Sequence, residues 1–180
     1  MTILTFEGRA PLVDPTAFVA PGARLMGDVE IGPEASIWYN CVLRGDMNRI
    51  RIGARTNVQD GTIIHVDPPR PGGPDIGFPA LIGEEVLIGH LAMVHGCILH
   101  DRAFVGLGSI VMDGCEIEGD AMLAAGAMLT PGKRIPAGQL WAGRPAKYVR
   151  DLREADLAGM RAGVAHYVAL ARRHAAALSG

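Results

Sequence analysis

Aliphatic side chains recur at every sixth position over most of this chain, from Val13 to Ile135. The series runs in four blocks, and the spacing changes at only three places between them. A period of six drifts off any helix face, and no simple strand is this long. The pattern indicates short strands joined by tight turns, each strand directing one aliphatic side chain inward. The nineteen positions are Val13, Val19, Leu25, Ile31, Ile37, Leu43, Ile52, Val58, Ile64, Ile82, Ile88, Val94, Leu99, Val105, Val111, Ile117, Leu123, Leu129 and Ile135.

Small residues often stand two positions before the phased aliphatic residue, as Ala23, Ala35 and Ala92 do, and glycine often follows it. This is the hexapeptide signature of a parallel β-helix. Proteins with this signature form left-handed prisms with three faces, so one coil takes about 18 residues. We therefore expect a mainly β protein, with a left-handed parallel β-helix over residues 1–148.

Two segments break the period of six. Residues 66–80 hold five prolines and three glycines, which predicts a loop protruding from a corner of the prism. Residues 149–180 form a second unit with a helical period, and Asp151 followed by Glu154 resembles a capping box. We expect this helix to pack along the prism through one apolar stripe. The stripe consists of Leu157, Met160, Val164, Tyr167, Ala171 and Leu178.

Charge and composition exclude several classes of protein. The net charge is −2 and no run of Lys or Arg is present, which argues against nucleic-acid binding. No apolar run is long enough to predict a membrane span, and the first residues do not resemble a secretory leader. The three cysteines are scattered, so we expect buried thiols and a cytoplasmic location.

Two histidines occupy equivalent positions in the repeat. His65 follows Ile64 and His95 follows Val94, and with the 66–80 loop left out these positions are three steps, or one coil, apart. Stacked strands lie about 4.8 Å apart, so the two imidazoles can converge on one metal ion. By the same count Arg44 lies one coil beyond His65. The sequence thus predicts a column of Arg44, His65 and His95, with Asp46, Gln59 and Asp60 near it in sequence.

A third histidine, His90, stands five residues before His95. On the β-helix it lies around a corner, on the order of 15 Å away along extended chain. It cannot easily join His65 and His95 within one chain, whereas a neighbouring chain could supply it. The spacing therefore suggests an ion shared between subunits.

Four stretches together resemble the γ-class carbonic anhydrase family: "RGD" at 44–46, "NVQDG" at 57–61, the histidine at 65 and "GHLAMVHGC" at 89–97. The resemblance covers roughly residues 10 to 170. It implies a homotrimer with Zn²⁺, or alternatively Fe²⁺ or Co²⁺, at each subunit interface. By position, His65 and His95 would share one ion with His90 of a neighbouring subunit.

The resemblance also assigns further residues. Gln59 would hydrogen-bond the metal-bound hydroxide and Asn57 would line the pocket. Arg44, with Asp46 and Asp60, would form ion pairs across the interface. Tyr167 is a candidate for reaching the pocket from the C-terminal helix, although packing of that helix is the simpler role.

The implied activity is that of a zinc-dependent lyase, the reversible hydration of CO₂ to bicarbonate by metal-bound hydroxide. The best-characterised family pattern has a glutamate directly after the Arg-x-Asp motif, where this chain has Met47. The 66–80 loop offers only Asp67 and Asp75, whose ordinary pKa of about 3.9 makes them poor proton acceptors, so we expect weak activity.

Two other classes of function are consistent with the repeat. One is a hexapeptide acyltransferase or another enzyme of CoA thioesters, which would use a histidine as general base. The other is a non-catalytic trimeric scaffold in which the metal only clips the subunits together.

Overall fold

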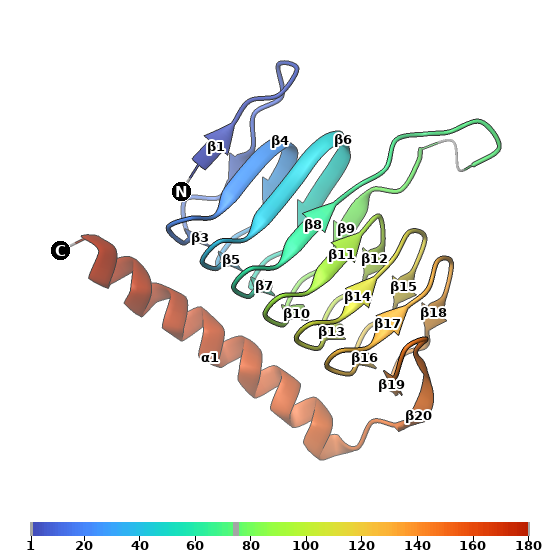
Figure 1. Cartoon of the computed structure of the whole chain (residues 1–180). Helices are drawn as coiled ribbons and strands as arrows, with labels where there is room; N and C mark the ends of the chain where they lie inside the picture. The colour runs from blue at the N-terminus through green and yellow to red at the C-terminus, as the bar shows by residue number, and fades with distance from the viewer. Residues whose placement is uncertain (1, 74–75, 180) are drawn as a thin grey trace.

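A computed structural model describes residues 2–73 and 76–179 of the chain. These residues form a parallel β-solenoid of short strands stacked on three faces, followed by one long helix (Figure 1). The hexapeptide-repeat β-helix predicted from the sequence is confirmed. Within the described ranges, no helix has the length and apolar character needed to cross a membrane.

The strands stack coil upon coil on three faces, which we call A, B and C. Face A holds β1 (Thr2–Leu4), the first halves of β4 (Arg24–Ile31) and β6 (Val42–Ile52), β8 (Ile63–His65), β11 (Met93–His95), β14 (Ile110–Val111) and β17 (Met128–Leu129). Face B holds β2 (Leu12–Val13), the second halves of β4 and β6, β9 (Ala80–Ile82), β12 (Ile98–Leu99), β15 (Glu116–Ile117) and β18 (Arg134–Ile135). Face C holds β3 (Phe18–Val19), β5 (Ser36–Ile37), β7 (Asn57–Val58), β10 (Leu87–Ile88), β13 (Phe104–Val105), β16 (Met122–Leu123), β19 (Gln139–Ala142) and β20 (Lys147–Asp151), the last antiparallel to β19.

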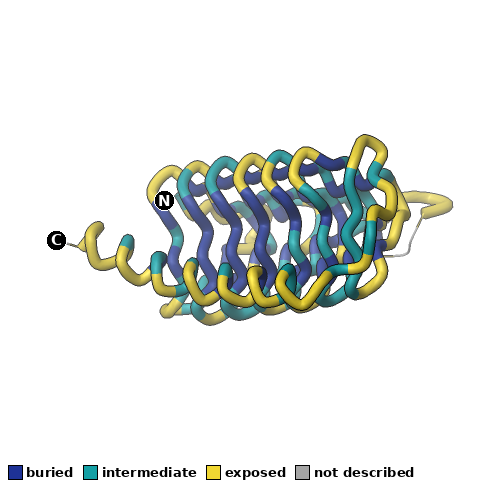
Figure 2. Tube along the Cα trace, turned by 90° about the horizontal axis from the view of Figure 1, so that it is seen from below, coloured by how far each residue is buried: buried dark blue, intermediate teal, exposed yellow. Residues whose placement is uncertain are grey.

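The phased aliphatic residues fill the interior of the solenoid. Seventeen of the nineteen positions are buried, and the two exceptions, Val13 and Val19, lie in the first coils and are partly buried. Figure 2 shows this buried interior inside exposed corners. Each inward residue stacks on its equivalent one coil away, as Ile64 does between Leu43 and Val94. Burying each such side chain contributes about 1.5–3 kcal/mol.

The proline-rich segment leaves the solenoid between β8 and β9, at the corner where faces A and B meet (Figure 1). We call this the A/B corner. The base of the segment closes through an antiparallel bridge between Asp67 and Phe78. Asp75, which the sequence offered as a proton acceptor, lies outside the described residues.

The C-terminal helix α1 (Glu154–Ser179) lies along face C and contacts β3, β5, β7 and β10. Met160, Val164 and Ala171 of the expected stripe are buried, and Tyr167 packs against Trp38. The inclusion of Leu178 in that stripe is wrong, because the last turns of the helix extend past the end of the solenoid (Figure 2) and leave Leu178 exposed.

The expected capping box is also displaced. Asp151 ends β20 and accepts a hydrogen bond from the Tyr148 hydroxyl instead of capping the helix. Asp156 takes the capping role, since its carboxylate accepts a hydrogen bond of 2.8 Å from the Arg153 backbone N–H. A carboxylate in the first turn that satisfies the N–H before it is the reciprocal half of a capping box.

Candidate metal centre

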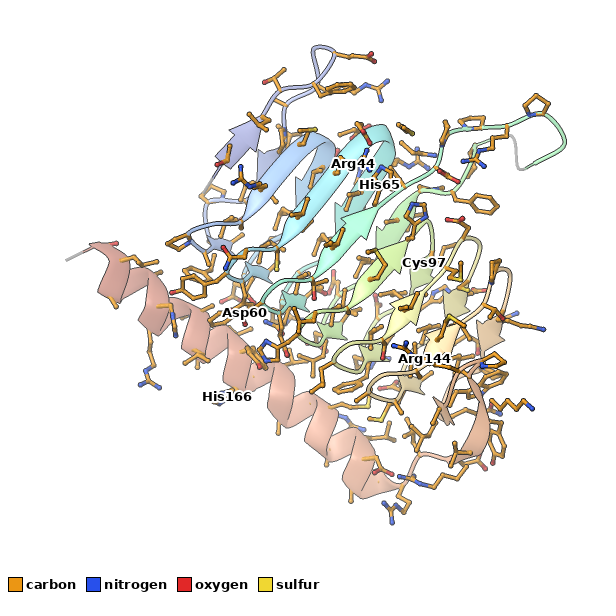
Figure 3. The ribbon with its side chains drawn as sticks, in the orientation of Figure 1. Arg44, Asp60, His65, Cys97, Arg144 and His166 are labelled. Carbon is orange, nitrogen blue, oxygen red and sulfur yellow. The ribbon has the colours of Figure 1, made fainter. Side chains whose placement is uncertain are left out.

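His65 and His95 end adjacent strands of face A and are paired in register. Arg44 pairs with His65 on the other side, so the structure contains the column Arg44, His65, His95. The Nδ1 atom of His65 lies 2.9 Å from Nε2 of His95, with ring centroids 5.0 Å apart. Figure 3 shows Arg44 and His65 at the A/B corner, beside the base of the protruding loop.

Each of these imidazoles has a carboxylate at its other nitrogen. Asp46 Oδ1 lies 3.0 Å from His65 Nε2, and Asp113 Oδ1 lies 2.5 Å from His95 Nδ1. Asp46 also accepts a hydrogen bond from the Arg44 guanidinium. Metal-binding histidines commonly donate their second N–H to a carboxylate, which fixes the tautomer and the ring orientation. The two aspartates hold the histidines in this way.

A count of protons tests whether this pair suits a cation. The chain Asp46, His65, His95, Asp113 contains three short contacts. Ionised carboxylates only accept hydrogen bonds, and two neutral imidazoles bring only two N–H groups. If each imidazole donates to its carboxylate, two nitrogen lone pairs face each other in the centre. A cation at that position, either a proton or a metal ion, would stabilise this arrangement.

Burial favours the metal over the proton at this position. It lowers the pKa of His65 below its ordinary value, and this effect outweighs the opposing hydrogen bond to Asp46. At Asp46 burial works against the charged form, but the hydrogen bonds from His65 and Arg44 prevail and lower the pKa of the carboxyl. The expected state at neutral pH is therefore a neutral His65 imidazole beside an ionised Asp46, and a neutral imidazole is the form that binds a metal.

His90 lies at the opposite edge of face A, at the turn between β10 and β11 that we call the C/A corner. Its Nδ1 is 2.9 Å from Asp60 Oδ2, and both side chains are almost half exposed. Figure 3 shows Asp60 at this edge, next to α1 and far from the Arg44 and His65 labels. Within residues 2–73 and 76–179, no three His, Cys, Asp or Glu side chains come close enough to hold a metal ion.

The other candidate residues belong to the C/A side of the molecule. Asn57 is buried on β7 and donates a hydrogen bond of 2.9 Å from Nδ2 to Ser36 Oγ, while its Oδ1 has no partner in the described structure. Gln59 is also buried, two residues further along the chain. Tyr167 approaches from α1; burial raises its pKa above the ordinary value, and the charge of Asp60 adds to this effect.

The candidate site is thus divided between two edges of face A. Gln59 and Asp60 do not join the histidine column of their own chain, although they lie near it in sequence. The sequence analysis missed Asp113, which stands eighteen residues after His95. One coil onward from His95, with the five-residue step from Val94 to Leu99 counted, leads to Met112, which directly precedes Asp113.

Comparisons with known proteins identify the family of this chain. No known family model matches the chain. Gamma carbonic anhydrase 2, mitochondrial, from Arabidopsis thaliana is 44% identical over 97% of this chain, which covers 62% of that protein. Gamma carbonic anhydrase 3, mitochondrial, from the same plant is 43% identical over 97% of this chain, which covers 67% of that protein. The chain therefore spans somewhat less than two thirds of the first of these relatives.

Solved structures show the same fold. A hexapeptide transferase family protein from Anaplasma phagocytophilum is 45% identical and superimposes with a TM-score of 0.88, over 95% of this chain and 96% of that one. The similarity to the plant proteins extends over 97% of this chain. The chain belongs to the gamma carbonic anhydrase family.

Proposed function

We propose that this protein is a metal-dependent lyase that hydrates CO₂ reversibly to bicarbonate, at sites shared between the subunits of a homotrimer. The observation that carries the proposal is the facing pair of His65 and His95, whose outer nitrogens are held by Asp46 and Asp113. Such a pair offers two nitrogen ligands to one ion. His90 of a neighbouring subunit would complete the set.

The surface of face A supports association with further copies of the chain. Leu91 and Leu107 at the C/A corner are 73% and 58% exposed, and Ile63 lies between the two edges at 39%. Exposed apolar side chains of this size gathered on one face are typical of a protein interface. Packing the C/A corner of one subunit against the A/B corner of the next would cover them and bring His90 to the histidine pair. In the same assembly Arg44 of one subunit would reach Asp60 of another.

Zn²⁺ is the ion we propose, with Fe²⁺ or Co²⁺ as alternatives, because three neutral imidazoles suit all of them. Bound by three histidines, such a metal would act as a Lewis acid and lower the pKa of bound water to about 7, as is known for carbonic anhydrase. His90 is oriented by Asp60, which lies at its Nδ1 and leaves Nε2 free.

Three residues on the C/A side would handle the substrate. The Gln59 amide can donate one hydrogen bond to an oxygen of bicarbonate and accept another. The Asn57 Oδ1 acceptor is already desolvated and without a partner in the described structure, so a ligand N–H or O–H would satisfy it. The Tyr167 hydroxyl is protonated at neutral pH and can donate a hydrogen bond there.

A hexapeptide acyltransferase acting on CoA thioesters is the second candidate, because the solved relative from Anaplasma phagocytophilum is named a hexapeptide transferase family protein. Such an enzyme needs one histidine as general base, and the paired histidines with their two carboxylates exceed that requirement. A non-catalytic trimer held by a structural metal is the third candidate. A cytoplasmic location remains a prediction, which rests on three buried, unpaired cysteines.

Metal analysis of anaerobically purified protein, followed by stopped-flow CO₂ hydration, tests the proposal. We expect one metal ion per subunit and hydration that His65→Ala and His95→Ala abolish. Metal without hydration would favour the scaffold. Binding of acetyl-CoA by a metal-free protein would favour the acyltransferase.

A further inference from the structure

The shorter of the two histidine–carboxylate contacts at the candidate metal centre joins His95 to a residue that none of the recognised motifs includes. Asp113 Oδ1 lies 2.5 Å from His95 Nδ1. Val94 pairs with Val111 on the next coil, and Asp113 stands two residues after the end of that strand. Among the described residues His95 is the one side-chain partner of Asp113, whereas Asp46 is shared between His65 and Arg44. Asp113 therefore acts on His95 alone.

Packing around this contact leaves it little freedom to move. Gly96 follows His95 with φ at +48°, in the left-handed region. A Cβ atom at Gly96 would lie 2.7 Å from Asp113 Oδ1 and 2.6 Å from Phe78 Cβ. Phe78 also approaches Gly114, where a Cβ would lie 3.0 Å from its ring. Phe78 at the base of the loop thus occupies the space beside both glycines, and Asp113 Oδ1 lies against Gly96.

The tautomer of His95 follows from this geometry. A neutral imidazole carries its proton on one nitrogen only, and an ionised carboxylate can only accept. A contact of 2.5 Å between them is a charge-assisted hydrogen bond, so the proton resides on Nδ1. The lone pair then resides on Nε2, the atom that faces His65.

We infer that Asp113 is a positioning residue that locks His95 in the Nδ1–H tautomer and aims its Nε2 lone pair at the ion shared with His65. The inference rests on the proposed metal site, but the tautomer itself exists without metal. Asp113 does not touch the ion or the substrate in this arrangement. Its effect is exerted through the orientation and basicity of one imidazole.

The test compares Asp113→Ala and Asp113→Asn with a matched control. His100 and Glu116 form another histidine–carboxylate contact, of 2.6 Å, away from the candidate site, so Glu116→Gln removes the same kind of charge there. The first measurement is the long-range ¹H–¹⁵N correlation of the histidine rings in metal-free protein. We expect His95 as the Nδ1–H tautomer in the wild type and in Glu116→Gln, and loss of that preference in Asp113→Ala.

The second measurement is the affinity for Zn²⁺, determined by competition with a chelator. Loss of a carboxylate behind a metal-binding histidine lowers metal affinity by about 10–100-fold. We expect a loss of that size in Asp113→Ala and no more than about a twofold change in Glu116→Gln. Asp113→Asn keeps the shape and an acceptor oxygen, so its loss should be intermediate, and it decides the matter if the alanine variant does not fold.

Two results would overturn the inference: an Nε2–H tautomer for His95 in the wild type, or wild-type Zn²⁺ affinity in both Asp113 variants. A wild-type protein that binds no Zn²⁺ would refute the proposed function instead. In that case the tautomer of His95 in wild type and Asp113→Ala still decides whether Asp113 positions this ring.

Discussion

Two variants that each lack a different metal ligand should complement each other in mixed trimers if the metal site is shared between subunits. His90→Ala leaves the A/B corner intact with His65 and His95, and His65→Ala leaves the C/A corner intact with His90. Because the structure puts these residues at opposite edges of face A, each variant loses a different half of every site. Homotrimers of either variant alone should hold no complete site.

The number of repaired sites follows from cyclic symmetry. In a ring of three subunits, each interface combines the A/B corner of one chain with the C/A corner of the next. A mixed trimer, whether it contains two chains of one variant or two of the other, has one interface that joins two intact halves. Mixed trimers should therefore bind about one third of the wild-type metal, whatever the ratio of the two chains.

Co-expression of the two variants with different affinity tags, and purification through both tags in turn, isolates the mixed trimers. Metal content per trimer and CO₂ hydration are then measured on the same sample. A control mixes wild-type protein with itself under both tags and should retain all sites. Mixed trimers without metal would refute the shared site, and so would stoichiometric metal in either variant alone.

Four further predictions concern stability, thiol reactivity, assembly and rate. Leu99→Ala empties a position that is 1% exposed and should lower the free energy of unfolding by about 2–5 kcal/mol. Ile98→Ala on the same strand, at a position 38% exposed, should lower the free energy of unfolding by less than about 1 kcal/mol. Urea unfolding of both variants tests this, and equal losses would contradict the assignment of Leu99 to the interior and Ile98 to the surface. Burial raises the pKa of the Cys41 thiol to about 12, so iodoacetamide at pH 8 should modify it only in unfolded protein, as mass spectrometry would show; rapid modification of the native protein would contradict its burial. Arg44→Ala should weaken the trimer by about 2 kcal/mol or more, because it leaves an interfacial carboxylate unpaired, and an unchanged sedimentation profile at micromolar concentration would exclude that pairing. Hydration of CO₂, measured by stopped flow, should be slow in dilute buffer and become faster as imidazole is added, because solvent buffer must carry the proton away. Met47→Glu, at a position 51% exposed, should raise the rate at low buffer concentration. Fast turnover without buffer dependence would show that another group carries the proton.

The β-helix was predictable from the sequence because every coil repeats the same local pattern and stacks on the next coil in the same register. Each coil contacts mainly its neighbours, so counting hexapeptide steps along the sequence predicts the register of Leu43, Ile64 and Val94 that the structure has. The same counting placed Arg44, His65 and His95 in one column. The helical period of the C-terminal segment failed at the end of α1, where the stripe continues to Leu178 although the solenoid beneath it has ended.

The start of α1 also needed the structure. Asp151 and Glu154 have the spacing of a capping box, but Asp151 is already engaged in β20. Asp156 instead accepts the Arg153 N–H and pairs with the Arg150 guanidinium. Several acidic residues compete for one role near this boundary, and the antiparallel pairing of β20 with β19 decides which of them takes it.

The sequence by itself determined the β-helix, the protruding loop and the pairing of His65 with His95, because a strict period converts distance along the chain into position in space. Only the tertiary structure showed that Asp113 contacts His95, that Asp46 contacts His65, and that Gln59 and Asp60 lie with His90 at the other edge of face A. Those relations depend on which way side chains turn at the corners. Corner geometry is set by the packing of neighbouring coils and of Phe78, and no period in the sequence encodes it.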